Sequence, residues 1–157
     1  MFAVSAEPTQ AFVDAIALRL TADNDAKHPQ SLRSLLGGTM KVYAHLSEIA
    51  RVAYPYVVLG RRGLDRHAGA MSLPGANVTL QLDGWSNYKG PYEMARILSR
   101  VSVLLERHPL VVTGFSPVDS SLTCELSEVF DEPDEDKPGS WLYHGVQRWT
   151  AEIHEAA

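Results

Sequence analysis

The hydrophobic pattern changes its period once within residues 77–108, and this change constrains the fold more than any other feature of the sequence. Apolar and polar residues alternate over 78–83, which predicts a strand with one buried face. A helix is predicted over 91–107, because a proline suits its first turn and the apolar residues recur about every 3.6 positions. These residues form one stripe: Met94, Ile97, Leu98, Val101, Leu104 and Leu105. Such a stripe needs a sheet to cover it, so Leu98 and Val101 are expected at the centre of a helix–sheet contact.

The remaining elements follow from the same two periods. They are helical segments at 8–20 and 31–36 and strands at 40–43, 54–60, 122–127 and 141–153. Residues 44–53 are assigned to a loop. The order of helix, strands, helix and strands favours the α+β class. We expect a mainly antiparallel sheet of about four to five strands, packed against the long helix (91–107) and the N-terminal helix (8–20). The length of 157 residues fits a single domain over 1–157.

Charge and composition exclude several classes of protein. The formal net charge is −5 and no stretch is rich in lysine or arginine, which argues against nucleic acid as the primary partner. No apolar run approaches the roughly 20 residues that a membrane span needs, and the N-terminus lacks the pattern of a secretory signal. The one cysteine, Cys124, excludes an internal disulfide framework and indicates a reducing cytoplasm. It falls on the inward face of the predicted strand at 122–127, so we expect a small core residue rather than a nucleophile.

Motifs for catalysis or phosphate binding are absent from the sequence. There is no G-x-G-x-x-G, no G-K-[ST] and no G-x-S-x-G. None of the six histidines is followed by another three or four positions later, and none lies near the cysteine, so the ligand spacing of a zinc site is missing. We therefore predict no catalytic residue, no metal and no cofactor.

Two polar clusters are the candidate contact sites. The only local basic cluster lies in a predicted loop over 61–75 and consists of Arg61, Arg62, Arg66 and His67. The acidic cluster lies in a predicted loop over 131–139 and consists of Asp131, Glu132, Asp134, Glu135 and Asp136. The acidic loop lacks the alternating ligands, central glycine and terminal glutamate of an EF-hand calcium loop. Loops concentrate binding residues, but for both clusters a solvated loop is the simpler interpretation.

Several segments, taken in order, resemble one known family. They are Lys41–Tyr43, Tyr54–Gly60, Leu82–Ser86, the helix over 90–105 and the strand over 141–149. The sequences Pro-Tyr-Val-Val-Leu-Gly and Asp-Gly-Trp-Ser within them are the most specific. This pattern looks like the tail completion proteins of long-tailed bacteriophages, also called tail terminator or tail-to-head joining proteins. The resemblance spans roughly residues 8–154 and departs from the family pattern at 21–39 and 44–53.

The resemblance implies a small subunit of a hexameric ring that caps the finished tail tube and docks to the head. The implied partners are further copies of the chain, the tail tube protein and the head connector or stopper protein. DNA would pass through the ring without specific binding. The implied location is the virion, at the head–tail interface, after assembly in the host cytoplasm. The two polar clusters then become candidate subunit or partner contacts, because a ring needs two different patches of one subunit to meet.

A second class of function stays open. A small-ligand-binding protein or an enzyme could use a cleft beside Trp85 and the long helix. Trp85, Trp141 and Trp149 could stack on a base or a sugar, although such residues more often anchor a core or an interface. The resemblance, in contrast, implies a structural protein without enzymatic activity.

Overall fold

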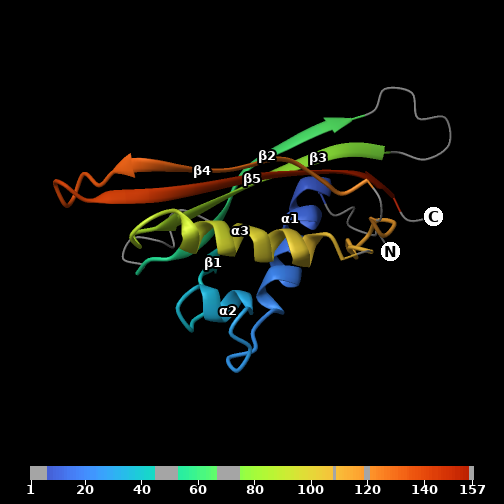
Figure 1. Ribbon diagram of the computed structural model, residues 1–157. Helices are drawn as coiled ribbons and strands as arrows, with labels where there is room; N and C mark the ends of the chain where they lie inside the picture. The colour runs from blue at the N-terminus through green and yellow to red at the C-terminus, as the bar shows by residue number, and fades with distance from the viewer. Residues whose placement is uncertain (1–6, 45–52, 67–74, 108, 119–120, 156–157) are drawn as a thin grey trace.

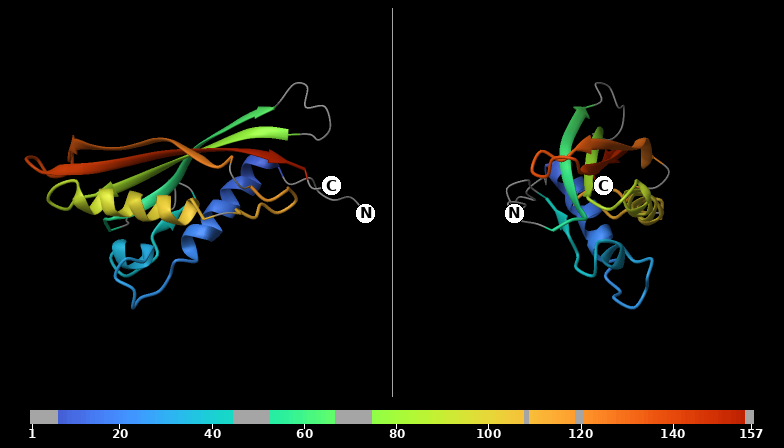
Figure 2. Two further views of the ribbon diagram at one scale, coloured as in Figure 1. Left: turned by 45° about the vertical axis from the view of Figure 1, so that its right-hand side comes forward. Right: turned by 60° about the vertical axis from the view of Figure 1, so that its left-hand side comes forward.

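The computed structural model describes residues 7–44, 53–66, 75–107, 109–118 and 121–155. The helices in this part of the chain are α1 (Pro8–Thr21), α2 (Leu32–Leu35) and α3 (Tyr92–Leu105). The strands are β1 (Val42–Tyr43), β2 (Tyr56–Arg66), β3 (Gly75–Ser86), β4 (Thr123–Pro133) and β5 (Trp141–His154). The strands form one sheet in the order β1-β2-β3-β5-β4, and the helices lie against one face of it (Figure 1 and Figure 2). The fold is α+β, as predicted.

One strand pair departs from the predicted antiparallel arrangement. β2 with β3, β3 with β5, and β5 with β4 are antiparallel, whereas β1 lies parallel to β2, with Val42 opposite Val57. The sheet is therefore mixed. β1 has only two residues, so its sequence is too short for a hydrophobic period to indicate a direction. The predicted loop over 44–53 lies largely outside the described residues.

The core lies between the helices and the covered face of the sheet. Every second residue of β3 is buried from Ala76 onward, which confirms the predicted alternation. The apolar stripe of α3 is buried along its whole length. Gly84 and Gly145 are cross-strand partners on β3 and β5, and a Cβ at either position would lie 2.6 Å from the Met94 sulfur. The two glycines therefore allow α3 to approach the sheet closely.

The limits and relative length of α3 differ from the prediction. The helix runs from Tyr92 to Leu105 with Pro91 as its N-cap, so it is shorter than the predicted 91–107. Its 14 residues equal the length of α1, so the long helix does not exceed the N-terminal helix within the described residues. No helix in the described ranges has the length and apolar character to span a membrane.

Both hairpins extend further than predicted. β2 continues to Arg66 and β4 to Pro133, so residues 61–66 and 131–133 are strand rather than loop. Their polar residues show no alternating hydrophobic pattern, and pairing with β3 and β5 holds them extended. The sequence signal failed here because the partner strands, and not the local pattern, decide the conformation.

The interpretation of Cys124 as a core residue is wrong, because its side chain is exposed. Leu122 is buried, as the alternation predicts, but a register shift between Cys124 and Leu126 interrupts the pattern. Such a shift places an extra residue in one strand of the pair. The inward positions therefore move to other residues after the shift, and Val129, opposite Gly145, packs against the core.

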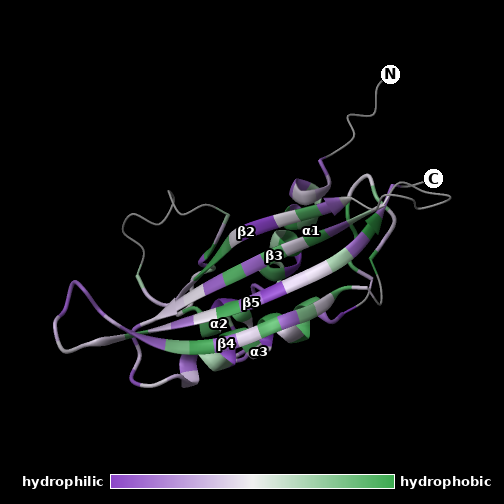
Figure 3. Cartoon of the chain, turned by 90° about the horizontal axis from the view of Figure 1, so that it is seen from above, coloured by the Kyte–Doolittle hydropathy of each residue, from purple (hydrophilic) through white to green (hydrophobic). Residues whose placement is uncertain are grey.

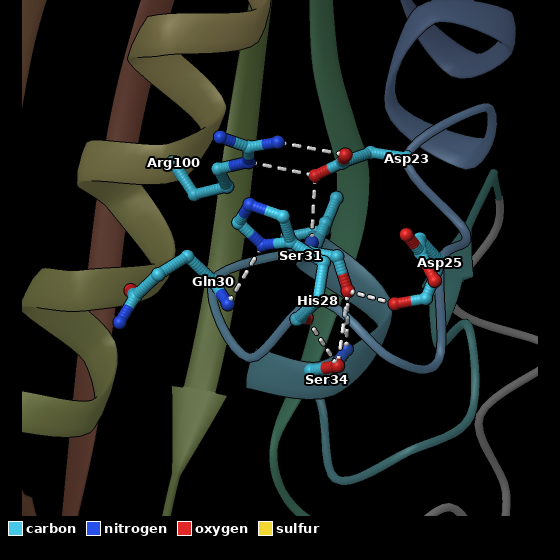
Figure 4. Close-up of polar contacts among 8 residues, drawn as sticks. Asp23, Asp25, His28, Gln30, Ser31, Ser34 and Arg100 are labelled. Atoms are coloured by element: carbon cyan, nitrogen blue, oxygen red, sulfur yellow. Dashed lines mark hydrogen bonds and ion pairs between the residues drawn. The ribbon is translucent and has the colours of Figure 1, made fainter.

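A polar joint fastens the connection between α1 and α2 to α3 (Figure 4). The Asp23 carboxylate accepts two hydrogen bonds from the Arg100 guanidinium, at 2.7 and 2.8 Å. It accepts a third from the backbone N–H of Leu32, at 2.7 Å. The guanidinium holds the pKa of Asp23 below its ordinary value of 3.8, although burial opposes this effect. One carboxylate thus joins the start of α2 to the middle of α3.

Candidate functional site

The face of the sheet opposite the helices carries a row of ring side chains, which we call the aromatic row. Tyr56, Trp85, His144 and Phe130 are successive cross-strand partners on β2, β3, β5 and β4. The glycine before Trp85 faces α3, and successive residues of a strand point to opposite faces, so Trp85 points away from the helices. Figure 3 shows this open face with the helices behind it.

Three rings of the aromatic row contact one another, and the fourth, Tyr56, contacts a neighbouring tyrosine. Trp85 and His144 stack with ring centroids 4.0 Å apart and an interplanar angle of 7°. Phe130 meets His144 edge to face at 5.3 Å, and Tyr56 stacks on Tyr54 at 5.5 Å. Phe130 stays 39% exposed. The row therefore combines a fixed geometry with apolar surface that a partner protein can cover.

His144 lies between two carboxylates on the neighbouring strands. Its Nε2 is 2.8 Å from Oδ1 of Asp83 on β3, and its Nδ1 is 3.4 Å from Oε1 of Glu132 on β4. Partial burial acts to lower the pKa of His144, but the hydrogen bonds and charges of Asp83 and Glu132 raise it above 6.5. The arrangement favours an imidazolium that links three strands. Sequence reasoning missed it, because the strand register alone brings these residues together.

A hollow of about 430 Å³ adjoins the aromatic row at β2. Its lining includes Val58, Gly60, Asp83 and Trp85. Gly60 leaves room for it, because a Cβ there would lie 2.7 Å from a carboxylate oxygen of Asp83. The sequence predicts a cleft beside Trp85 and the long helix; the hollow does lie beside Trp85, but α3 takes no part in it, since the sheet separates Trp85 from α3. Trp149 belongs to the core, with 1% of its surface exposed.

The structure places the two predicted polar clusters near opposite edges of the sheet. Arg61, Arg62 and Arg66 lie on β2 rather than in a loop, and Asp131 and Glu132 lie on β4. β3 and β5 lie between these two strands, so one subunit does not bring the clusters together. The remaining acidic residues, Asp134, Glu135 and Asp136, precede β5 in the turn of the hairpin. His67 lies outside the described residues.

Both edges of the sheet contain backbone that pairs with no strand of the described residues. β4 pairs only with β5, and we call its outer side, over Thr123–Pro133, the β4 edge. β1 pairs with β2 only at Val57 and Val58, and we call the remainder of β2, over 59–66, the free half of β2. The described residues contain no group of three or more His, Cys, Asp or Glu side chains arranged to hold a metal ion.

The comparison with protein families matches one profile, described as tail completion protein gp17, over residues 25–153. The chain belongs to this family. The match covers the α2 segment and nearly all of the sheet, including the aromatic row and both polar clusters. A comparison with curated proteins gives no match.

A solved structure supports the fold independently. One chain of the "virion of native gene transfer agent (GTA) particle" superimposes with a TM-score of 0.66 and 19% sequence identity. The alignment covers 98% of this chain and 99% of that chain. Family and fold together confirm the resemblance found in the sequence. The chain is a structural protein of a phage-type tail, and its location is the virion.

The contacts of His144 with Asp83 and Glu132 predict that the stability of the fold depends on pH. The raised pKa means that the stabilisation is fully present below pH 6.5 and is lost as the pH rises through the folded pKa. We expect a loss of about 1 kcal/mol across this window, because the groups are partly exposed. Urea unfolding from about pH 6 to about pH 9 measures it. His144→Gln and Asp83→Asn should both flatten the dependence, and an unchanged slope in either variant would contradict the assignment.

Proposed function

We propose that this chain forms a ring that closes the end of a phage-type tail tube and joins the tail to the head connector. The observation that carries the proposal is the family match over residues 25–153. The similarity of fold to a chain from a gene transfer agent virion supports it, because that chain also belongs to a particle. The partners on this proposal are the tail tube protein on one side and the connector or stopper protein on the other.

The surface of the subunit is compatible with a ring of identical copies. A closed ring arises when two different patches of one subunit meet head to tail. The chain offers two such patches, since the basic and acidic clusters lie on different sides of the sheet. On this proposal the ring is a hexamer. Six linked contacts with the tube give an avidity far above that of one, so each subunit needs only a modest patch.

The charge of the subunit also suits the passage of DNA. A formal net charge of −5 disfavours adhesion of a phosphate backbone by like-charge repulsion. We propose that DNA crosses the ring without specific binding. Closure of the tube and attachment of the head need complementary surfaces rather than chemistry, so the proposed role requires neither catalysis nor a cofactor.

Removal of the protein from its producing system tests the proposed function. Electron microscopy of the lysate should show full heads beside unjoined tails, some of them longer than normal, because nothing stops the addition of tube subunits. Supplying the wild-type chain from a plasmid should restore joined particles. If normal numbers of joined, infectious particles appear without the protein, the proposal fails. The hollow beside Trp85 would then become the first place to look for a ligand.

A further inference from the structure

We infer that the β4 edge of one copy of this chain pairs with the free half of β2 of the next copy, so that the sheet continues from subunit to subunit. This inference rests on the proposed ring and specifies its contact. The partner is a second copy of the same chain, and the contact joins two different surfaces. It places the arginines of β2 beside the acidic residues of β4, which a single subunit keeps apart.

The backbone provides the first argument. The β4 edge is 11 residues long and most of its residues are exposed. In the described residues its outer N–H and C=O groups have no strand partner. A long open edge is a template for a further strand. Among the described residues, the free half of β2 is a second open edge of the same sheet, because β1 ends its pairing at Val58.

Charge decides which edges can meet. The β4 strand carries Glu125, Glu128, Asp131 and Glu132 and no basic residue. Two β4 edges would therefore repel each other, which disfavours a symmetric dimer through this strand. The free half of β2 carries three arginines and one aspartate. An acidic edge and a basic edge attract, and their union is head to tail, the type of contact that closes a ring.

Strand direction also fits. β2, β3, β5 and β4 are antiparallel at each step, so β4 runs opposite to β2. If the next copy keeps the same orientation, its β2 continues the sheet beside β4 as one more antiparallel neighbour. The pairing therefore needs no inversion of either subunit and no change of sheet type.

The position of β1 requires an offset between copies. The strand register places Arg62 level with Leu80, Trp149 and Cys124 across one subunit. Without an offset, the next copy would continue the same register. The end of its β2 that β1 covers would then lie against Glu128, since Val58 is level with that residue. A shift of about four residues, or roughly 14 Å, instead moves that end to Glu132 and Pro133, at the end of β4. It also brings Arg61, which lies in the register shift between Leu59 and Arg62, level with Phe130, between Glu128 and Glu132. A stagger of this kind accompanies any sheet that closes on itself.

Cysteine cross-linking tests the contact. In a Cys124→Ser background, a chain that carries Arg61→Cys together with Glu128→Cys or Asp131→Cys should give a ladder of covalent oligomers with a short bismaleimide. Each single-cysteine chain should stay monomeric on a denaturing gel. The control combines Arg61→Cys with Lys27→Cys and should not cross-link. Lys27 lies in the α1–α2 connection, which is on the side of the helices that faces away from the sheet (Figure 1).

A charge exchange tests the complementarity. Arg61→Glu and Glu128→Arg should each raise the concentration needed for assembly, in solution or on purified tails, by about tenfold. The chain that carries both changes should assemble nearly as well as wild type, because the reversed charges attract again. Lys27→Glu makes the same change in charge as Arg61→Glu away from both edges and should have no effect. A loss caused only by misfolding would not be rescued by the double change.

The outcomes separate this contact from the ring itself. A ladder together with charge rescue supports the pairing of β4 with β2. Rings that form, and cap tails normally, without cross-links or charge effects overturn the pairing and leave the proposed function standing. A chain that shows no self-association even on purified tails overturns both.

Discussion

Replacing Leu98 with alanine should lower the free energy of unfolding by about 2–5 kcal/mol. Leu98 lies in the middle of the α3 stripe and is 4% exposed. Its Cδ1 lies 3.1 Å from the position that a Cβ on Gly145 would take. The side chain thus fills the space directly against the sheet. Its removal loses the burial of three carbons and leaves a cavity that the close helix–sheet contact cannot collapse to fill.

Urea unfolding followed by circular dichroism measures this loss. Val103→Ala is the matched control, because Val103 lies on the same helix and is 46% exposed. It should change the stability by no more than about 0.5 kcal/mol. If Leu98→Ala has an effect as small as the control, the stripe does not make the contact that the structure shows.

Asp23→Ala should lower the free energy of unfolding by about 3 kcal/mol at neutral pH. The change removes both hydrogen bonds from Arg100 and the one from the Leu32 N–H, and it leaves a guanidinium with 18% of its side chain exposed without its partner. The dependence of stability on acidic pH tests the same interaction. Because the folded pKa of Asp23 is lowered, its stabilisation is fully present above pH 3.8 and is lost as the pH falls through the folded pKa.

Asp25→Ala is the control for this joint. The Asp25 side chain accepts one exposed hydrogen bond from the backbone N–H of Lys27, so its loss should be less than about 1 kcal/mol. Asp23→Asn keeps an acceptor but removes the charge, and it should abolish the acid-dependent part of the stability difference. Equal losses for Asp23→Ala and Asp25→Ala at neutral pH would show that the joint with Arg100 contributes little.

The sequence predicted best where a hydrophobic period runs uninterrupted. The stripe of α3 and the alternation of β3 each have one buried face over many residues, so the local pattern and the tertiary packing agree. The strand ends at 61–66 and 131–133 are polar, and only their partners make them extended. Prediction therefore failed where long-range pairing supplies the information that the local residues lack.

The candidate contact residues show the same division. The residue types and the two charged clusters were visible in the sequence, and so was the family resemblance. Their positions on opposite sides of the sheet follow from the strand order, in which β5 lies between β3 and β4. The same order creates the stack of Trp85 on His144, because the two residues are 59 positions apart in the chain and become neighbours only through the β3–β5 register. No local pattern contains that register.

The β4–β5 hairpin extends past the beginning of α3 (Figure 1 and the left view of Figure 2). Along β5 the exposure falls from 52% at Trp141 to continuous burial at Gly145, Val146 and Gln147. The free energy of local opening should therefore rise along this one strand, and amide protons near the turn should exchange with solvent long before those beneath α3. The hairpin tip can consequently bend to fit a neighbouring molecule while the cooperative core of the domain remains closed.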